Sequence, residues 1–209
     1  MNAIWYFDVV SPFSYLALRD IETLSQRMPV IYEPVLFGAM LAHYGQLGPA
    51  EVAPKRVHTY RTALWAARRD GIELRFPPAH PFNPLQLLRV LTALEARQDA
   101  VRAVFDLIWR EGRDPHAPES LTLLCERLAI ADLDQLIEKS GAKAKLRRNT
   151  EAAIGAGVFG VPTLRLGEQC FWGADALPMA RAYLADPVMF EDAEMRRLDN
   201  LPKGVERAR

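Results

Sequence analysis

Cysteine is scarce in this sequence: among 209 residues, only Cys125 and Cys170 are cysteines. They lie far apart and outside the C-x-x-C spacing that redox and zinc sites use. This argues against a disulfide framework and against a cysteine metal site, so we expect no metal. We interpret both as reduced core residues of a cytoplasmic protein.

Long hydrophobic runs and an excess of one charge are also missing. No apolar stretch approaches the roughly 20 residues that span a bilayer. Met1 and Asn2 lead directly into a predicted strand, without the basic start of a signal peptide. The 26 basic residues balance the 26 acidic ones, whereas binding to nucleic acid or an anionic membrane needs a basic excess. We therefore expect neither partner.

The most informative stretch that is present runs from Phe7 to Leu16. Residues 4–10 form a mostly apolar run, rich in aromatic and β-branched types, which predicts a buried strand. Ser11 and Pro12 then form a helix start, with serine as the N-cap and proline at the first helical position. Apolar residues follow at helical spacing as far as Met28. Free N–H groups at such a junction favour an anion.

Ser11 on its own has an ordinary interpretation as a helix cap. Its spacing to Ser14, however, matches the position of Cys-x-x-Cys in thioredoxin-like oxidoreductases. Oxygens replace both sulfurs here. The junction would still stabilise a thiolate, but the thiol would have to come from a ligand.

The order of predicted elements indicates a fold class. Residues 30–37 form a second strand, in which Pro34 favours an edge or a bulge. From Gly38 to about Thr150 we find no convincing strand, only loops and helices, one of them over about 100–111. A hairpin of Thr163–Leu166 and Gln169–Trp172 around a Gly-Glu turn follows. A closing helix follows over 176–184. The sequence thus predicts an α/β, thioredoxin-like βαβ…ββα fold with an inserted all-helical domain. The thioredoxin-like domain would consist of residues 1–37 and 151–187, and the helical insertion of residues 38–150. Residues 188–209 would form a loosely ordered tail.

Two further motifs flank the predicted hairpin. Pro162 occupies the position of the cis-proline of thioredoxin-like folds, where the alternative is a trans edge-strand proline. A cis bond would turn the backbone of Val161 outward, so that a peptide ligand could pair with it. Asp175 begins the last helix; it is either a simple cap or the partner of a ligand ammonium, as in the γ-glutamyl end of glutathione.

These motifs resemble a known family. Residues 6–184 are similar to the 2-hydroxychromene-2-carboxylate isomerases and the kappa-class glutathione transferases, both related in fold to the disulfide oxidoreductase DsbA. The resemblance is carried by Phe-Asp-x-x-Ser-Pro-Phe-Ser-Tyr-Leu at 7–16, Phe-Gly-Val-Pro-Thr at 159–163 and Trp-Gly-x-Asp at 172–175.

The resemblance implies that glutathione is the cofactor and assigns residues to it. Ser11 would be the catalytic serine that contacts the glutathione sulfur, and Val161 before Pro162 would pair with the cysteinyl backbone. Lys55 would meet the glycyl carboxylate. The γ-glutamyl site would consist of Trp172, Gly173, Ala174 and Asp175. The family also implies a homodimer.

The second-substrate site departs from the family pattern. Gln46 stands where the family has asparagine. The family's substrate-binding lysine would fall near Met40, and its Asn-Arg pair near residues 51–52, but none of these residues is present there. We predict that the pocket is lined by Phe37, His80 and Asn83, although the alternatives are a core phenylalanine, a surface histidine and a helix cap.

Three functions compete at this point. The first is a glutathione-dependent isomerase acting on a small aromatic or conjugated catabolic intermediate by reversible thiolate addition. The second is a kappa-like glutathione transferase or peroxidase, which would consume glutathione. The third is a redox-inactive thioredoxin-like module that only binds a partner. Glutathione binding separates the enzymes from the module.

Overall fold

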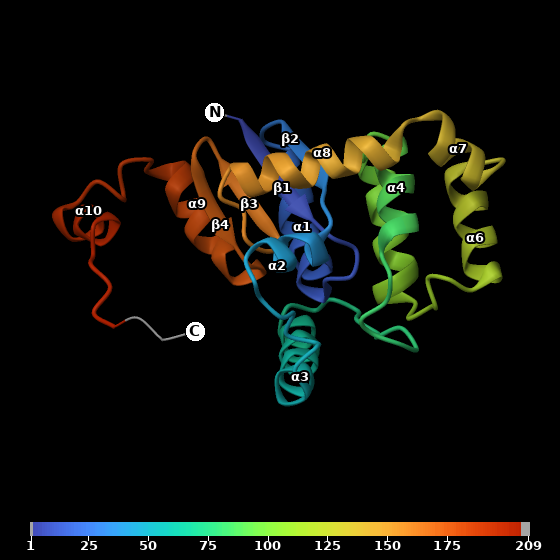
Figure 1. Ribbon diagram of the computed structural model, residues 1–209, viewed down its shortest axis with the longest axis horizontal. Coiled ribbons are helices and arrows are strands. Elements are labelled where there is room, and N and C mark those ends of the chain that lie inside the picture. The colour runs from blue at the N-terminus through green and yellow to red at the C-terminus, as the bar shows by residue number, and fades with distance from the viewer. Residues whose placement is uncertain (1, 206–209) are drawn as a thin grey trace.

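The centre of the molecule is a four-stranded sheet in the order β2-β1-β3-β4, as the computed structural model shows for residues 2–205. β1 (Ala3–Phe7) pairs in parallel with β2 (Val30–Pro34) and antiparallel with β3 (Thr163–Leu166). β3 pairs antiparallel with β4 (Gln169–Trp172). The sheet therefore joins segments from the two ends of the chain (Figure 1), which confirms the thioredoxin-like fold class.

Helices surround this sheet, and most of them lie in sequence between β2 and β3. α1 follows β1, and α9 follows β4 with a short 3₁₀ turn, η2, between them. The helices and their bounds are α1 (Pro12–Ser25), α2 (Phe37–His43), α3 (Ala53–Arg69), α4 (Leu85–Ala93), α5 (Gln98–Phe105), the π-helix η1 (Asp106–Arg110), α6 (Pro118–Leu128), α7 (Leu133–Lys139), α8 (Ala142–Gly155), η2 (Ala174–Ala176), α9 (Leu177–Ala185) and α10 (Ala193–Asp199).

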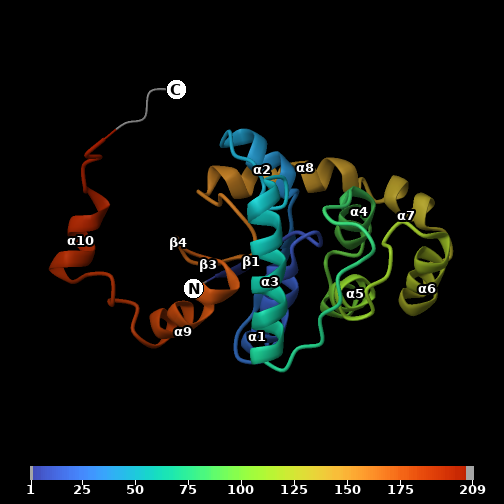
Figure 2. The same cartoon turned by 90° about the horizontal axis from the view of Figure 1, so that it is seen from below.

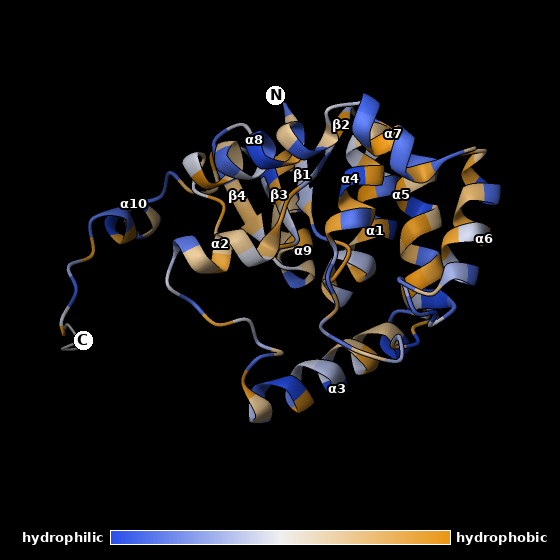
Figure 3. Cartoon of the chain, turned by 45° about the vertical axis from the view of Figure 1, so that its right-hand side comes forward, coloured by the Kyte–Doolittle hydropathy of each residue, from blue (hydrophilic) through white to orange (hydrophobic). Residues whose placement is uncertain are grey.

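Both faces of the sheet are covered because the side chains of β1 alternate. Ala3, Trp5 and Phe7 enter the main core with α1, α4, α5 and α9. Ile4 and Tyr6 face a smaller cluster with residues of α2 and α8. Figure 3 shows both hydrophobic and hydrophilic bands on helices such as α4, α5 and α7.

The second strand ends three residues earlier than the sequence predicts. Two distant side chains take the N–H groups that a longer strand would pair: Leu36 donates to Oγ1 of Thr150 at 3.0 Å, and Phe37 donates to Oδ2 of Asp8 at 2.9 Å. The chain turns there into α2, a helix that the local pattern did not indicate.

Two other predicted segments also differ. The helix expected over 100–111 changes to π-helical geometry at Asp106. The tail contains α10, whose cap Asp192 accepts N–H groups from Glu194 and Met195. Figures 1 and 2 both show α10 apart from the other elements. The predicted division into domains stays a prediction.

Within residues 2–205, the helices are too short or too polar to cross a bilayer.

Candidate active site

Ser11 lies where the sequence predicts it, as the N-cap of α1. Its backbone is extended, its side chain is 7% exposed, and its Oγ accepts the N–H of Ser14 at 3.2 Å. The amide of Phe13 has no hydrogen-bond partner among residues 2–205. A free N–H and a hydroxyl proton are thus available at the positive end of a 14-residue helix.

The cis-proline segment lies beside this helix start. The Val161–Pro162 bond is cis, as predicted. β3 pairs Thr163 with Tyr6, and this antiparallel register continued by one residue places Pro162 opposite Phe7, at the end of β1 that leads to Ser11. Neither the N–H nor the C=O of Val161 has a backbone partner in the part of the chain that the structure describes. A ligand backbone could pair with both groups.

The segment that follows β4 reaches the same end of the sheet. The N–H of Gly173 donates to the carbonyl of Pro162 at 2.8 Å, and η2 packs against α1. Gly173 has φ +96°, and a side chain there would collide with the carboxylate of Asp175. The structure therefore brings Ser11, Pro162 and Gly173 together and leaves the carboxylate of Asp175 exposed.

Trp172 and Phe159 form an exposed aromatic pair next to this segment. Their ring centroids are 5.1 Å apart, and the exposed fractions are 53% and 41%. The indole of Trp172 lies over Gly160, where a side chain would collide with it. Two large apolar surfaces thus remain open to a ligand at this edge of the site.

Lys55 is an exposed residue of another helix. It lies in the first turn of α3, exposed, on a helix that projects from the rest of the fold in Figure 1. A flexible ammonium in this position could meet a carboxylate, and this role stays a prediction.

The sequence analysis missed the residues that fix the turn before Ser11. Asp8 is fully buried, and its Oδ1 accepts the N–H of Val10 at 3.0 Å while Oδ2 accepts the N–H of Phe37. The indole of Trp109, from η1, donates to the carbonyl of Val9 at 2.9 Å. Trp109 is one hundred residues away in sequence, so no local pattern reveals this contact.

Burial dominates the electrostatics of this turn. It raises the pKa of Asp8 to about 7, because two backbone N–H groups only partly compensate for the lost hydration. Burial also lowers the pKa of His80, although the hydrogen bond to Val10 opposes that shift.

The three predicted pocket residues have different surroundings. Phe37 begins α2 and packs, half-buried, against the smaller core cluster. His80 is half-buried, with both ring nitrogens bonded to protein atoms. Asn83 is exposed, and its Oδ1 accepts the N–H of Leu85 at the start of α4. None of the three is shown to contact a ligand, so the pocket stays a prediction.

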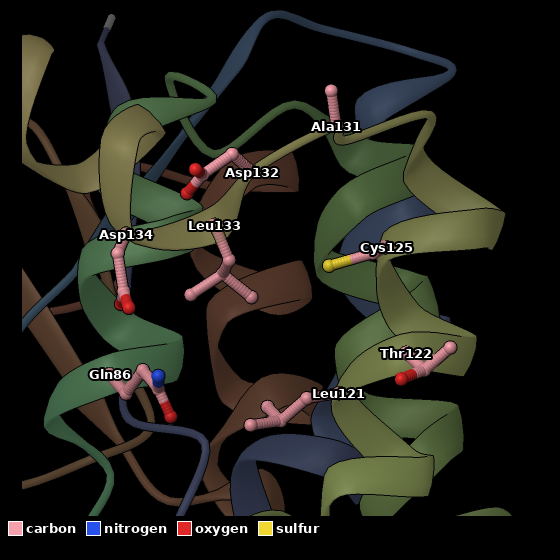
Figure 4. Close-up of a pocket in the computed structure, with 8 residues that line it drawn as sticks. All are labelled: Gln86, Leu121, Thr122, Cys125, Ala131, Asp132, Leu133 and Asp134. Carbon is pink, nitrogen blue, oxygen red and sulfur yellow. The ribbon is translucent and has the colours of Figure 1, made fainter.

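A surface pocket of about 370 Å³ lies elsewhere, in the helical part of the molecule. Figure 4 shows the residues that line it, which come from α4, α6, α7 and the loop between the last two: Gln86, Leu121, Thr122, Cys125, Ala131, Asp132, Leu133 and Asp134. It contains none of the predicted site residues. The candidate site at the start of α1 therefore rests on its chemical groups and not on this pocket.

Comparison with known proteins supports the same family. The model of the DSBA-like thioredoxin domain matches residues 4–185. The chain is 31% identical over 183 residues to the 2-hydroxychromene-2-carboxylate isomerase of Pseudomonas putida, covering 84% of this chain and 90% of that protein. It is 26% identical over 205 residues to glutathione S-transferase kappa 2 of Caenorhabditis elegans, covering 88% and 91%.

A solved structure agrees with these relatives. The structure of a 2-hydroxychromene-2-carboxylate isomerase superposes with a TM-score of 0.79 at 27% identity, covering 93% of this chain and 99% of that one. Sequence and fold therefore agree, and the chain belongs to the DsbA-like family, in the group of the 2-hydroxychromene-2-carboxylate isomerases and kappa-class glutathione transferases.

Proposed function

We propose that this protein is a glutathione-dependent isomerase that acts on an aromatic catabolic intermediate, in the manner of a 2-hydroxychromene-2-carboxylate isomerase. One observation carries the proposal: the helix start that stabilises a thiolate has Ser11 and Ser14 but no thiol. A thiol-bearing cofactor supplies what the chain lacks.

The residues present fit glutathione. The unpaired backbone groups of Val161 can bind the cysteinyl unit as an added strand. The exposed carboxylate of Asp175 suits the γ-glutamyl ammonium, and the start of η2 suits its carboxylate, with Trp172 beside them. Lys55 on α3 suits the glycyl carboxylate.

Ser11 stabilises the charged form of the sulfur. Its Oγ already accepts the amide of Ser14, so its own proton is free to donate. A free thiol has a pKa of about 8.5, and helix N-termini lower this to roughly 3.5–7.5. When bound, glutathione would supply a thiolate that adds reversibly to a conjugated carbon and is regenerated after bond rotation. The chain orients that sulfur and keeps it deprotonated.

A kappa-like transferase or peroxidase is the second candidate, and a specific observation favours it. The family's substrate lysine falls near Met40, and Met40 is fully buried in the smaller core cluster. Position 40 therefore cannot contact the carboxylate of an aromatic acid.

Incubation with 2-hydroxychromene-2-carboxylate and a substoichiometric amount of glutathione separates these functions. The isomerase proposal predicts many turnovers per glutathione and full recovery of free glutathione by mass spectrometry. Consumption of one glutathione per product would establish the transferase. Sedimentation of the same sample tests the homodimer that the family resemblance supports.

A further inference from the structure

The turn that leads into the Ser11 cap is fixed from outside by a histidine. The ring nitrogen Nε2 of His80 lies 2.8 Å from the carbonyl oxygen of Val10. Because a carbonyl oxygen can only accept, Nε2 must carry the hydrogen of this bond. His80 therefore holds the peptide that connects Val10 to Ser11.

The other ring nitrogen faces the hydroxyl of Tyr60. Nδ1 of His80 lies 2.8 Å from the hydroxyl of Tyr60, and the same hydroxyl lies 2.7 Å from the main-chain carbonyl of His80. With hydrogen on Nε2, the neutral ring has its lone pair on Nδ1, so Nδ1 and the His80 carbonyl are both acceptors for the single proton of the Tyr60 hydroxyl. The bond to Val10 places the hydrogen on Nε2, and the Tyr60 hydroxyl holds the backbone and the other edge of the ring in place.

Aromatic packing keeps the ring in this orientation. The centroid of the His80 ring lies 5.2 Å from that of Tyr60, 5.5 Å from that of Trp109, and 6.1 Å from those of Phe76 and Phe82. A ring enclosed on several sides cannot turn away from the carbonyl without displacing its neighbours.

The contacts join three separate parts of the site. Tyr60 belongs to α3, which also bears Lys55 in its first turn. At 1.5 Å per residue, the two residues are about 7.5 Å apart along the helix axis. His80 belongs to the loop before α4, and Val10 belongs to the turn before α1. One imidazole therefore couples the helix that bears Lys55 to the serine cap.

We propose that His80 is a positioning residue, which orients the Ser11 cap through its Nε2–H bond to Val10 and is itself oriented by Tyr60. Its role for the bound sulfur rests on the proposed function, whereas its role for the cap does not. If His80 instead lined the second-substrate pocket, one of its ring nitrogens would be free to bind substrate.

The test begins with the protein free of glutathione. Long-range proton–nitrogen spectra should show hydrogen on Nε2 and not on Nδ1 of His80. His80→Ala should speed exchange of the Ser14 amide, which bonds to Ser11 Oγ, by roughly two- to tenfold, the effect of one lost neutral hydrogen bond. His80→Gln keeps an N–H donor of similar reach and should restore most of the protection.

Two further variants sharpen this result. Tyr60→Phe removes the hydroxyl that contacts both the carbonyl and Nδ1 of His80, and it should speed the same exchange. His116→Gln is the matched control, since His116 also contacts the ring of Phe82 but is exposed; it should leave the exchange unchanged. If His80→Ala does not fold, the glutamine and phenylalanine variants decide the question.

Glutathione then provides an independent measurement. The pKa of the bound thiol should rise in His80→Ala and return toward wild type in His80→Gln, while affinity for S-methylglutathione stays nearly unchanged. A hydrogen on Nδ1 in the wild type, unchanged Ser14 exchange in His80→Ala, or a glutamine variant no better than alanine would overturn the positioning role. Failure of the wild type to bind glutathione would overturn the proposed function alone, because Ser14 exchange still decides the role of His80.

Discussion

Asp8 should make the protein less stable as pH rises. The carboxyl is fully buried beside the Ser11 turn, and its pKa lies at about 7 in the folded protein against 3.8 as the ordinary value. Between these two values the folded state binds more protons than the unfolded state, so the free energy of unfolding falls with rising pH. The shift corresponds to about 4 kcal/mol in total, of which about 2 kcal/mol is lost between pH 5 and pH 7.

Asp8→Asn removes this titration. The amide is neutral at every pH, but it presents only one acceptor to the N–H groups of Val10 and Phe37, which costs about 1–3 kcal/mol. The variant should therefore be less stable than wild type at pH 5 and should approach or exceed it near pH 8. Burial lowers the pKa of His80 from its ordinary value of 6.5, so this residue makes the free energy of unfolding rise with pH below 6.5. This contribution is present in both proteins. The difference between their stability–pH profiles therefore isolates Asp8.

Urea unfolding of both proteins across this pH range is the assay. Asp175→Asn, at an exposed carboxylate of the same site, is the control and should keep the wild-type slope. Parallel profiles for wild type and Asp8→Asn would refute the reasoning, because they would mean that Asp8 does not titrate in this range.

Three other predictions concern the thiolate site directly. Ser11→Ala should raise the pKa of bound glutathione by about one to two units, because a hydrogen bond to a charged group contributes roughly 1.5–3 kcal/mol; thiolate absorbance measures this, and an unchanged pKa would leave Ser11 as a cap only. Asp175→Ala should weaken glutathione binding, measured by calorimetry, because the ligand ammonium loses its charged partner while no helix cap is lost, and an unchanged dissociation constant would contradict the γ-glutamyl assignment. Because Ser11 and Ser14 replace both sulfurs, the protein alone should not reduce insulin, and turbidity that develops without added thiol would disprove this.

The sequence predicted those parts of the site that local chemistry determines. Ser11 and Pro12 show a helix start because their backbone preferences are local. The hairpin bounds at 163–166 and 169–172 agree with β3 and β4, since a Gly-Glu turn fixes the register. Pro162 is cis, as its position before that hairpin indicates.

Long-range contacts account for what the sequence did not show. The early end of β2 depends on acceptors from Asp8 and Thr150. The contact of Trp109 with Val9 joins residues 100 positions apart in the sequence. The contact of His80 with Val10 joins residues 70 positions apart. The local pattern of residue types in a single sequence does not reveal such long-range pairs. The one signal in the sequence was Asp8, a charged residue between a predicted buried strand and a helix start, because charged side chains are rarely buried unless they are paired.

Addition of glutathione to the protein near neutral pH, followed by ultraviolet absorbance of the thiolate, tests the central claim most directly. The account predicts a saturable rise of the thiolate signal with one glutathione per chain, competition by S-methylglutathione, and a smaller rise in Ser11→Ala. Saturable binding without a thiolate signal, or no binding at all, would contradict the claim that the start of α1 stabilises a thiolate supplied by glutathione.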